Sequence, residues 1–238
     1  MDFYNEYLVP ILRETAAVIE KTDHMQDILH GTMSLERMRF QIKQNYQYLM
    51  DYTRCWAVGF SKCESYDDME IWYSIVKNTM ENTVMMNRTY WAEQLDMSVE
   101  EMDAVIEAEG KRSYTAFQLM IAHEGDLAKT MMALFPCNIL YRFFGENLLG
   151  QCTLEKDNMY YQWLAYYVSD EYIKKTENEI AIVNRLCKNK TDKEIARLLE
   201  IFATSCNYEI LQWSDMYHNM TTWPLESIFP KKHTTIKD

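Results

Sequence analysis

Residues 34–62, SLERMRFQIKQNYQYLMDYTRCWAVGFSK, carry the strongest structural signal in the chain. Apolar side chains recur here in steps of three and four only, which is the period of one face of an α-helix. Ser34 stands where an N-cap belongs, because its hydroxyl can accept a hydrogen bond from a free N–H of the first turn. The spacing predicts one long helix with a single buried stripe: Leu35, Met38, Ile42, Tyr46, Leu49, Tyr52, Trp56 and Phe60.

Helical signals continue on both sides of this segment. Residues 66–93 keep the same period, and the capping-box pairs Ser98/Glu101 and Thr191/Glu194 predict two further helix starts. The stripe expected in residues 66–93 is Met69, Trp72, Ile75 or Val76, Met80 and Val84.

Pro136 can begin another helix, since the N–H that proline lacks has no partner in the first turn anyway. Runs of strict alternation are never longer than a few residues, so strands are not expected. We therefore expect one all-α domain of seven or more helices over residues 1–230. The polar segment 231–238 is expected to be a frayed tail.

The composition narrows the class of protein. With 238 residues, 6 glycines and 4 prolines, the chain has too few turn residues for a many-stranded sandwich or barrel. A net charge of −12 without a basic cluster disfavours nucleic-acid binding and suits a small or cationic ligand better. Neither a secretory signal nor an apolar run long enough to span a membrane is recognisable, so we expect a cytoplasmic protein. The six scattered cysteines then indicate reduced thiols.

Cys137 is the first candidate for chemistry. It follows Pro136, in the first turn of the expected helix, where the helix dipole and free N–H groups lower the pKa of a thiol. Tyr141, Phe144 and Leu148 continue an inward stripe from the same position. The alternative is an inert core cysteine, which is common in proteins.

Glu209 is the second candidate. It fills a gap of seven in the apolar stripe of the last long helix, between Cys206 and Trp213. A carboxylate in a core must be paired, bound to a ligand or raised in pKa, and the last of these is typical of a general acid or base. A salt bridge across the bundle is the alternative reading.

Aromatic side chains suggest a pocket for a flat polar ligand. Asn45, Tyr48 and Tyr52 share one face of the helix over residues 34–62. Further rings that could line such a pocket are Tyr114, Tyr166, Tyr167 and Trp213. These rings could also simply fill the core.

A metal centre is not expected. Asp27-x-x-His30 and Asp215-x-x-His218 have the spacing of di-iron ligands, but such bundles need glutamates from two more helices, and His30 stands just before Gly31 at an expected helix end. The glycines also lack the pattern of a phosphate-binding loop. We therefore expect no cofactor.

Five segments together resemble a known family. They are HGTMSLERMRFQIKQNYQYL (30–49), SYT (113–115), LFPCNILY (134–141), Tyr166–Tyr167 and NYEILQWSDMY (207–217). In order and spacing, over residues 20–220, they resemble the thiaminase II (TenA) family. That resemblance implies an all-α, haem-oxygenase-like fold, a homotetramer, and hydrolysis of an aminopyrimidine or thiamin in thiamin salvage.

The resemblance also implies roles for individual residues. Cys137 matches the family's nucleophile and Glu209 its catalytic glutamate. The remaining matches are substrate-binding positions: Tyr48, Tyr114, Tyr141 and Tyr167. Tyr52 and Trp213 are expected to wall the same pyrimidine ring. Asn45 departs from the family pattern, which has an aspartate there, and loss of one charge-assisted hydrogen bond costs about 1.5–3 kcal/mol.

The implied reaction is attack of Cys137 on the pyrimidine ring while Glu209 protonates a ring nitrogen. An acidic surface would favour a cationic substrate such as thiamin. The main alternative is a pyrimidine-binding protein without turnover, in which Asn45 marks lost or altered activity. A haem or di-iron relative on the same fold is a second alternative.

Overall fold

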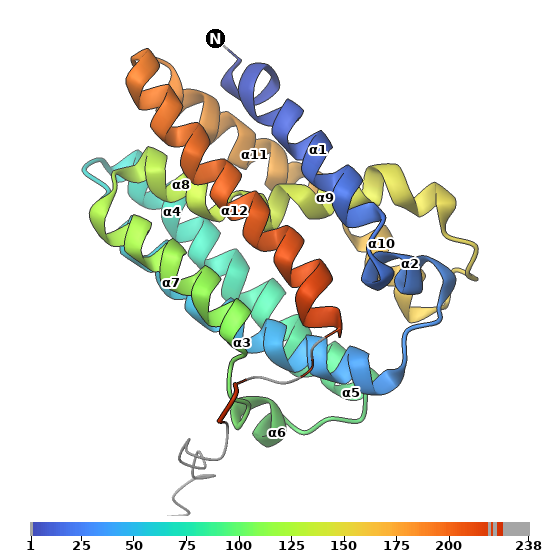
Figure 1. Cartoon of the computed structure of the whole chain (residues 1–238). Coiled ribbons are helices and arrows are strands. Elements are labelled where there is room, and N and C mark those ends of the chain that lie inside the picture. The colour runs from blue at the N-terminus through green and yellow to red at the C-terminus, as the bar shows by residue number, and fades with distance from the viewer. Residues whose placement is uncertain (1, 219, 221–222, 226–238) are drawn as a thin grey trace, which may run out of the picture.

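The computed structural model describes residues 2–218, 220 and 223–225. Its α-helices pack around one hydrophobic core, and no strand occurs in these residues, so the predicted all-α class is confirmed (Figure 1). The helices are α1 (Val9–Glu20), α2 (Asp23–His30), α3 (Leu35–Phe60), α4 (Tyr66–Asn78), α5 (Ala92–Gln94), α6 (Val99–Asp103), α7 (Glu109–Glu124), α8 (Leu127–Leu134), α9 (Pro136–Leu148), α10 (Met159–Tyr166), α11 (Asp170–Cys187) and α12 (Asp192–His218). The predicted tail at 231–238 lies outside the described residues.

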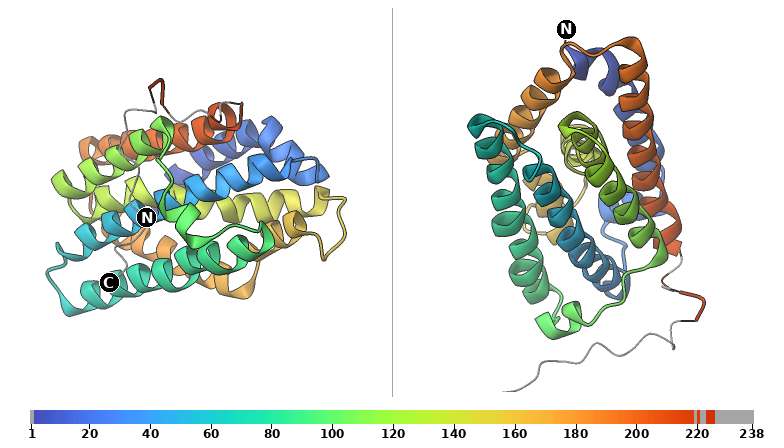
Figure 2. Two further views of the ribbon diagram at one scale, coloured as in Figure 1. Left: turned by 90° about the horizontal axis from the view of Figure 1, so that it is seen from below. Right: turned by 90° about the vertical axis from the view of Figure 1, so that its left-hand side faces the viewer.

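The centre of the bundle is the pair α8 and α9. Seen along its length in the right-hand view of Figure 2, it runs between α3, α4, α7, α11 and α12, and it packs against α3, α7, α11 and α12. Every residue from Met131 to Pro136 is buried, because this segment is apolar around its whole circumference. Pro136 begins α9 as predicted. Cys137, which follows it, is half-buried and packs against the core.

The long predicted helix is α3, and its N-cap is Ser34, whose side chain accepts from the backbone N–H of Arg37. The middle of the expected stripe is buried: Met38, Ile42, Tyr46, Leu49, Tyr52 and Trp56. Leu35 is half exposed instead, because it lies in the first turn, beyond the helices that cover the rest of α3.

Residues 66–93 are helical as predicted, but the expected stripe is wrong in two places. Met69 and Met80 are exposed, whereas Trp72, Thr79 and Val84 are buried. Residues 79–84 form a π-helix, which adds a residue to the turn and shifts the buried face by a step of five. The hydrophobic period of an α-helix therefore does not continue through this segment.

The predicted helix ends agree with the structure. The capping boxes at Ser98 and at Thr191 both form, and the chain turns at Gly31, where φ is 65°. All six cysteines are free thiols. No helix in the described part of the chain is long and apolar enough to cross a membrane.

Candidate active site

A cavity of about 110 Å³ lies among α2, α3, α7, α9, α10, α11 and α12. An apolar cavity of about 150 Å³ is known to hold benzene, so this volume suits one small ring. The lining brings together several predicted residues from distant parts of the sequence: Asn45, Cys137, Tyr141, Tyr167 and Trp213.

Cys137 is placed by the break between α8 and α9. Because proline interrupts the backbone hydrogen bonds there, two carbonyls near the break accept from side chains instead. The carbonyl of Ala133 accepts from Ser205 Oγ at 2.9 Å, and the carbonyl of Leu134 accepts from Tyr52 Oη at 3.0 Å. These two hydrogen bonds anchor the break between α8 and α9 in the core. The break in turn fixes the direction in which the Cys137 thiol points into the cavity.

The expectation of a lowered thiol pKa is wrong for Cys137. Burial raises the pKa of Cys137, and the nearby carboxylate of Glu209 raises it further. Tyr48, Lys111 and Lys175 lower it, but by less than burial raises it. The stabilisation of the thiolate by the helix dipole is therefore smaller than the cost of removing the thiolate from water.

Glu209 lies on the buried face of α12, as its place in the stripe predicts, with only 1 % of its surface exposed. Burial raises its pKa to about 7, while Lys111, Tyr114 and Cys137 act in the opposite direction. Its Oε1 has no hydrogen-bond partner among the described residues. A carboxyl that titrates near neutrality beside a thiol can accept the proton of that thiol and pass it on.

Three of the predicted substrate-binding tyrosines lie behind the cavity rather than on its surface. Tyr48 and Tyr52 stack at 5.6 Å between ring centres, and Tyr48 and Tyr114 at 5.5 Å. Tyr48 Oη accepts from Gln118 Nε2 at 3.0 Å, and the same hydroxyl lowers the pKa of the Cys137 thiol by hydrogen bonding to it. These rings support Cys137 and Glu209 and are not part of the cavity lining.

The aromatic wall of the cavity is made by Tyr141, Tyr167, Trp163 and Trp213. Tyr141 and Tyr167 are 5.0 Å apart, and Trp213 lies 5.9 Å from Trp163. Gly145 allows this wall to form, because a Cβ there would meet Val168 Cγ1 at 2.8 Å. Trp163 was not singled out from the sequence, since nothing in its neighbourhood marks it.

Lys111 and Gln212 also line the cavity and were missed. Lys111 Nζ donates to Gln212 Oε1 and lies 4.7 Å from the centre of the Tyr48 ring. Both follow the period of candidates already identified, with Lys111 three residues before Tyr114 and Gln212 three after Glu209. Helical spacing could therefore have found them.

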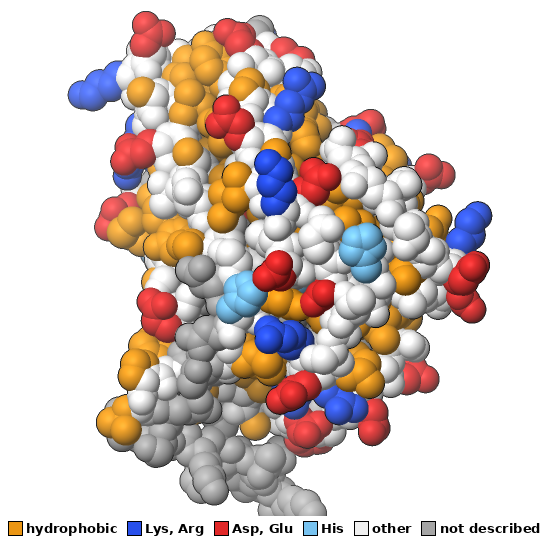
Figure 3. Space-filling model, turned by 45° about the vertical axis from the view of Figure 1, so that its right-hand side comes forward, with side chains coloured by type: hydrophobic (Ala, Val, Ile, Leu, Met, Phe, Trp, Pro, Cys, Tyr) orange, Lys and Arg blue, Asp and Glu red, His pale blue; other side chains and the backbone are white. Residues whose placement is uncertain are grey.

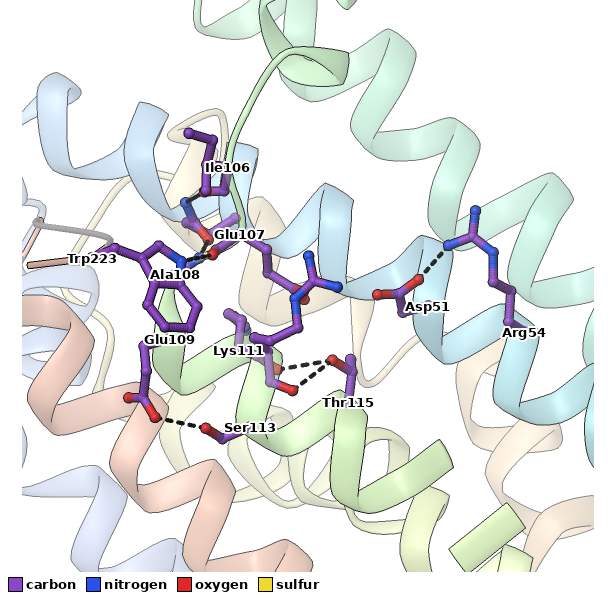
Figure 4. Close-up of polar contacts among 12 residues, drawn as sticks. Asp51, Arg54, Ile106, Glu107, Ala108, Glu109, Lys111, Ser113, Thr115 and Trp223 are labelled. Atoms are coloured by element: carbon purple, nitrogen blue, oxygen red, sulfur yellow. Dashed lines mark hydrogen bonds and ion pairs between the residues drawn. The ribbon is translucent and has the colours of Figure 1, made fainter. Parts of the chain in front are cut away.

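The start of α7 is held firmly, which fixes Lys111 (Figure 4). Gln44 Nε2 donates to the carbonyl of Ile106, and the N–H of Ala108 donates back to Gln44 Oε1 at 2.7 Å. Trp223 Nε1 donates to the carbonyl of Glu107 at 2.9 Å. Lys111 thus enters the cavity from a braced helix end.

His24 is a further missed residue of the lining. Its ring lies 4.4 Å from Trp213, and burial lowers its pKa to about 3, so it is neutral. Nδ1 of His24 and Nε2 of Gln212 are buried without a hydrogen-bond partner among the described residues. Buried polar atoms are normally satisfied, so these two indicate where a polar ligand is expected to bind.

A search of known protein families gives a clear match. The model of the TENA/THI-4/PQQC family covers residues 19–220. The chain belongs to this family.

Two curated relatives of this chain are named aminopyrimidine aminohydrolase. The protein of Halalkalibacterium halodurans is 30% identical over 84% of this chain and 88% of its own. The protein of Bacillus subtilis (strain 168) is 28% identical over 81% of this chain and 80% of its own. A crystal structure described as a TenA family transcription regulator from Silicibacter sp. superposes with a TM-score of 0.79 at 21% identity, over 88% of this chain and 95% of that one. The last comparison establishes the shared fold alone.

For this family member, the described residues contain no group of three His, Cys, Asp or Glu side chains that could hold a metal ion. His30 ends α2 just before Gly31, as expected, and is exposed.

Proposed function

We propose that this protein is an aminopyrimidine aminohydrolase of the thiaminase II type, which converts 4-amino-5-aminomethyl-2-methylpyrimidine to the hydroxymethylpyrimidine in thiamin salvage. The observation that carries the proposal is the pairing of Cys137 with Glu209 beside a cavity sized for one ring. The relatives named aminopyrimidine aminohydrolase support it.

The proposed reaction begins when Glu209 accepts the thiol proton and the sulfur of Cys137 adds to C6 of the pyrimidine. Glu209 passes that proton to the adjacent ring nitrogen, so the adduct is a neutral enamine. The 4-amino group then pushes out the 5-aminomethyl nitrogen, which is protonated at neutral pH and so leaves as ammonia. Water adds to the exocyclic methylene and gives up a proton; the ring nitrogen returns its proton and the C–S bond breaks. A thiolate suits this sequence because it is both a good nucleophile and a good leaving group.

The remaining cavity residues would orient the ring. Tyr141, Tyr167 and Trp213 offer π-faces, and Asn45 can accept from the 4-amino group through its oxygen and donate to a ring nitrogen through its amide NH₂. Tyr48, Tyr52 and Tyr114 act from behind the cavity by holding the catalytic pair in place. All of these roles use side chains alone, without a metal or cofactor.

The deciding experiment measures formation of the hydroxymethylpyrimidine from the aminomethyl compound and, in parallel, from thiamin. Wild type should turn over at least one of them, and Cys137→Ala should abolish turnover while retaining binding. Cys152→Ala is the matched control, because Cys152 is also half-buried but lies outside the cavity. Tight binding without turnover by wild type would contradict the enzyme and leave the pyrimidine-binding alternative.

We further propose a cytoplasmic homotetramer that does not bind nucleic acid. Lys and Arg side chains are scattered among acidic ones on the face in Figure 3, in keeping with the net charge of −12. The outer face of α4 exposes Tyr66, Met69 and Tyr73, which offers an apolar surface for a second copy. Light scattering would test the assembly, and Tyr73→Glu should weaken it.

A further inference from the structure

A groove of about 610 Å³ lies between α4 and α11. Ile71 and Ile75 form its apolar wall on α4, and Ala181 and Ile182 form the wall on α11. Ligand sites in proteins are typically apolar clefts of about 300–1,000 Å³ with a few polar groups. The groove therefore has room for a small organic molecule. It is distinct from the cavity of the proposed reaction, with which it shares Lys175 alone among the described residues.

Glu179 is the buried acidic residue of this groove. It belongs to the lining, yet only 1 % of its surface is exposed. Its Oε1 accepts from Asn138 Nδ2 at 2.9 Å, whereas its Oε2 has no hydrogen-bond partner among the described residues. Buried carboxylate oxygens are normally satisfied by donors, because an unpaired one is costly to remove from water. The free oxygen of Glu179 therefore indicates where a donor from a ligand is expected.

The two basic residues of the lining do not supply that donor. Lys175 lies one turn before Glu179 on α11, but its Nζ donates to Asn138 Oδ1 at 3.2 Å rather than to Glu179. Arg185 is paired with Asp68 at 2.6 Å. Burial raises the pKa of Glu179 to about 7, although Lys175 lowers it. Above neutrality this carboxyl is therefore ionised without a cation in direct contact.

We infer that the groove between α4 and α11 is a second ligand site, which binds small organic ammonium ions with Glu179 as their counter-ion. The ammonium would donate to Oε2 of Glu179 while an apolar body packs on Ile71 and Ile75. Glu70 also lines the α4 side, and the net charge of −12 attracts cations from afar. A metal ion fits less well, because the described residues contain no group of three His, Cys, Asp or Glu side chains to hold it. This site does not depend on the proposed reaction.

The test is a binding measurement with two probes of nearly equal size. Benzylammonium carries a charged head on one ring, and benzyl alcohol is its neutral counterpart. Calorimetry at about pH 8 keeps Glu179 largely ionised. Benzylammonium should bind about tenfold or more tightly than benzyl alcohol, because that is the usual worth of a hydrogen bond to a charged group. Glu179→Gln should bring the two affinities close together.

Glu177→Gln is the matched control, because Glu177 is exposed on the same helix and lies outside the groove. Ala181→Phe is a second variant: Ala181 is exposed on the groove wall, so the larger ring should fill the groove and weaken benzylammonium binding several-fold. Equal affinity for the two probes would overturn the inference. So would a preference that survives both Glu179→Gln and Ala181→Phe, since the ammonium would then bind elsewhere. These assays need no turnover, so they can fail while the aminohydrolase is active.

Discussion

The thiol of Cys137 on α9 and the carboxyl of Glu209 on α12 shift each other's pKa in opposite directions. The carboxylate makes the thiol harder to ionise, and the thiol stabilises the carboxylate. Removal of the last proton from these two side chains is therefore unfavourable. That proton is the one that the proposed reaction moves from the sulfur of Cys137 to the ring.

This relationship predicts an acid limb in the pH profile. Glu209 must be ionised to accept the thiol proton, and its pKa is about 7, so kcat/KM should rise as pH increases through that value. Steady-state assays across the range would measure it. Glu209→Gln should lose at least a hundredfold in kcat, in line with the usual size of general acid–base effects, and should lose the limb. A limb that survives in Glu209→Gln would assign it to another group.

Glu179 should make the protein less stable as pH rises. Burial raises its pKa from 4.5 to about 7, so the native state binds more protons than the unfolded chain between those values. The free energy of unfolding therefore falls as pH rises across that window. The Glu179→Gln variant has no carboxyl to ionise, so it avoids this loss, and its amide oxygen can still accept from Asn138. Urea unfolding should show the variant stabilised by about 1–3 kcal/mol at about pH 8 and much less at about pH 5. An equal effect at both values would contradict this account.

Asn45→Asp should change the charge preference of the cavity. The substitution is nearly isosteric and places a carboxylate in a lining that otherwise has two lysines and no acid. A charge-assisted hydrogen bond is worth about 1.5–3 kcal/mol, so kcat/KM for thiamin or the aminomethyl compound should rise about tenfold or more. Unchanged relative rates for neutral and cationic substrates would show that Asn45 does not face the charged group.

Gly145→Ala should weaken the junction between α9 and α10. The added Cβ would lie 2.8 Å from Val168 Cγ1 and 3.2 Å from the carbonyl oxygen of Leu164, so one helix must move. Overpacking of this kind costs about 1–3 kcal/mol, measurable by urea unfolding. Because α10 carries Trp163, activity should fall as well. Gly150→Ala is the control, since nothing lies within 4 Å of a Cβ there, and a similar loss in that variant would point to backbone effects.

Much of the helical framework could be read from local sequence. Ser34, the two capping boxes and Pro136 act on backbone groups within four residues of themselves, so their effects do not depend on the rest of the fold. The burial of Glu209 could also be predicted, because residues on one face of a long helix recur with a known period. The π-helix at 79–84 could not be predicted, since no local signal marks the residue at which the turn widens.

The electrostatics of the site depend on residues far apart in the chain. Position in a first helical turn predicts a lowered pKa for the Cys137 thiol, but burial among helices raises it. Tyr48, Tyr52 and Tyr114 are in the right region, yet packing places them behind the cavity wall. Lys111, Lys175 and Asn45 come from three helices, and their shared cavity appears only when α7, α11 and α3 close around α9. Periodicity reports which face of a helix is buried, whereas burial depth and the sign of the local field are sums over neighbours that the chain brings together only on folding.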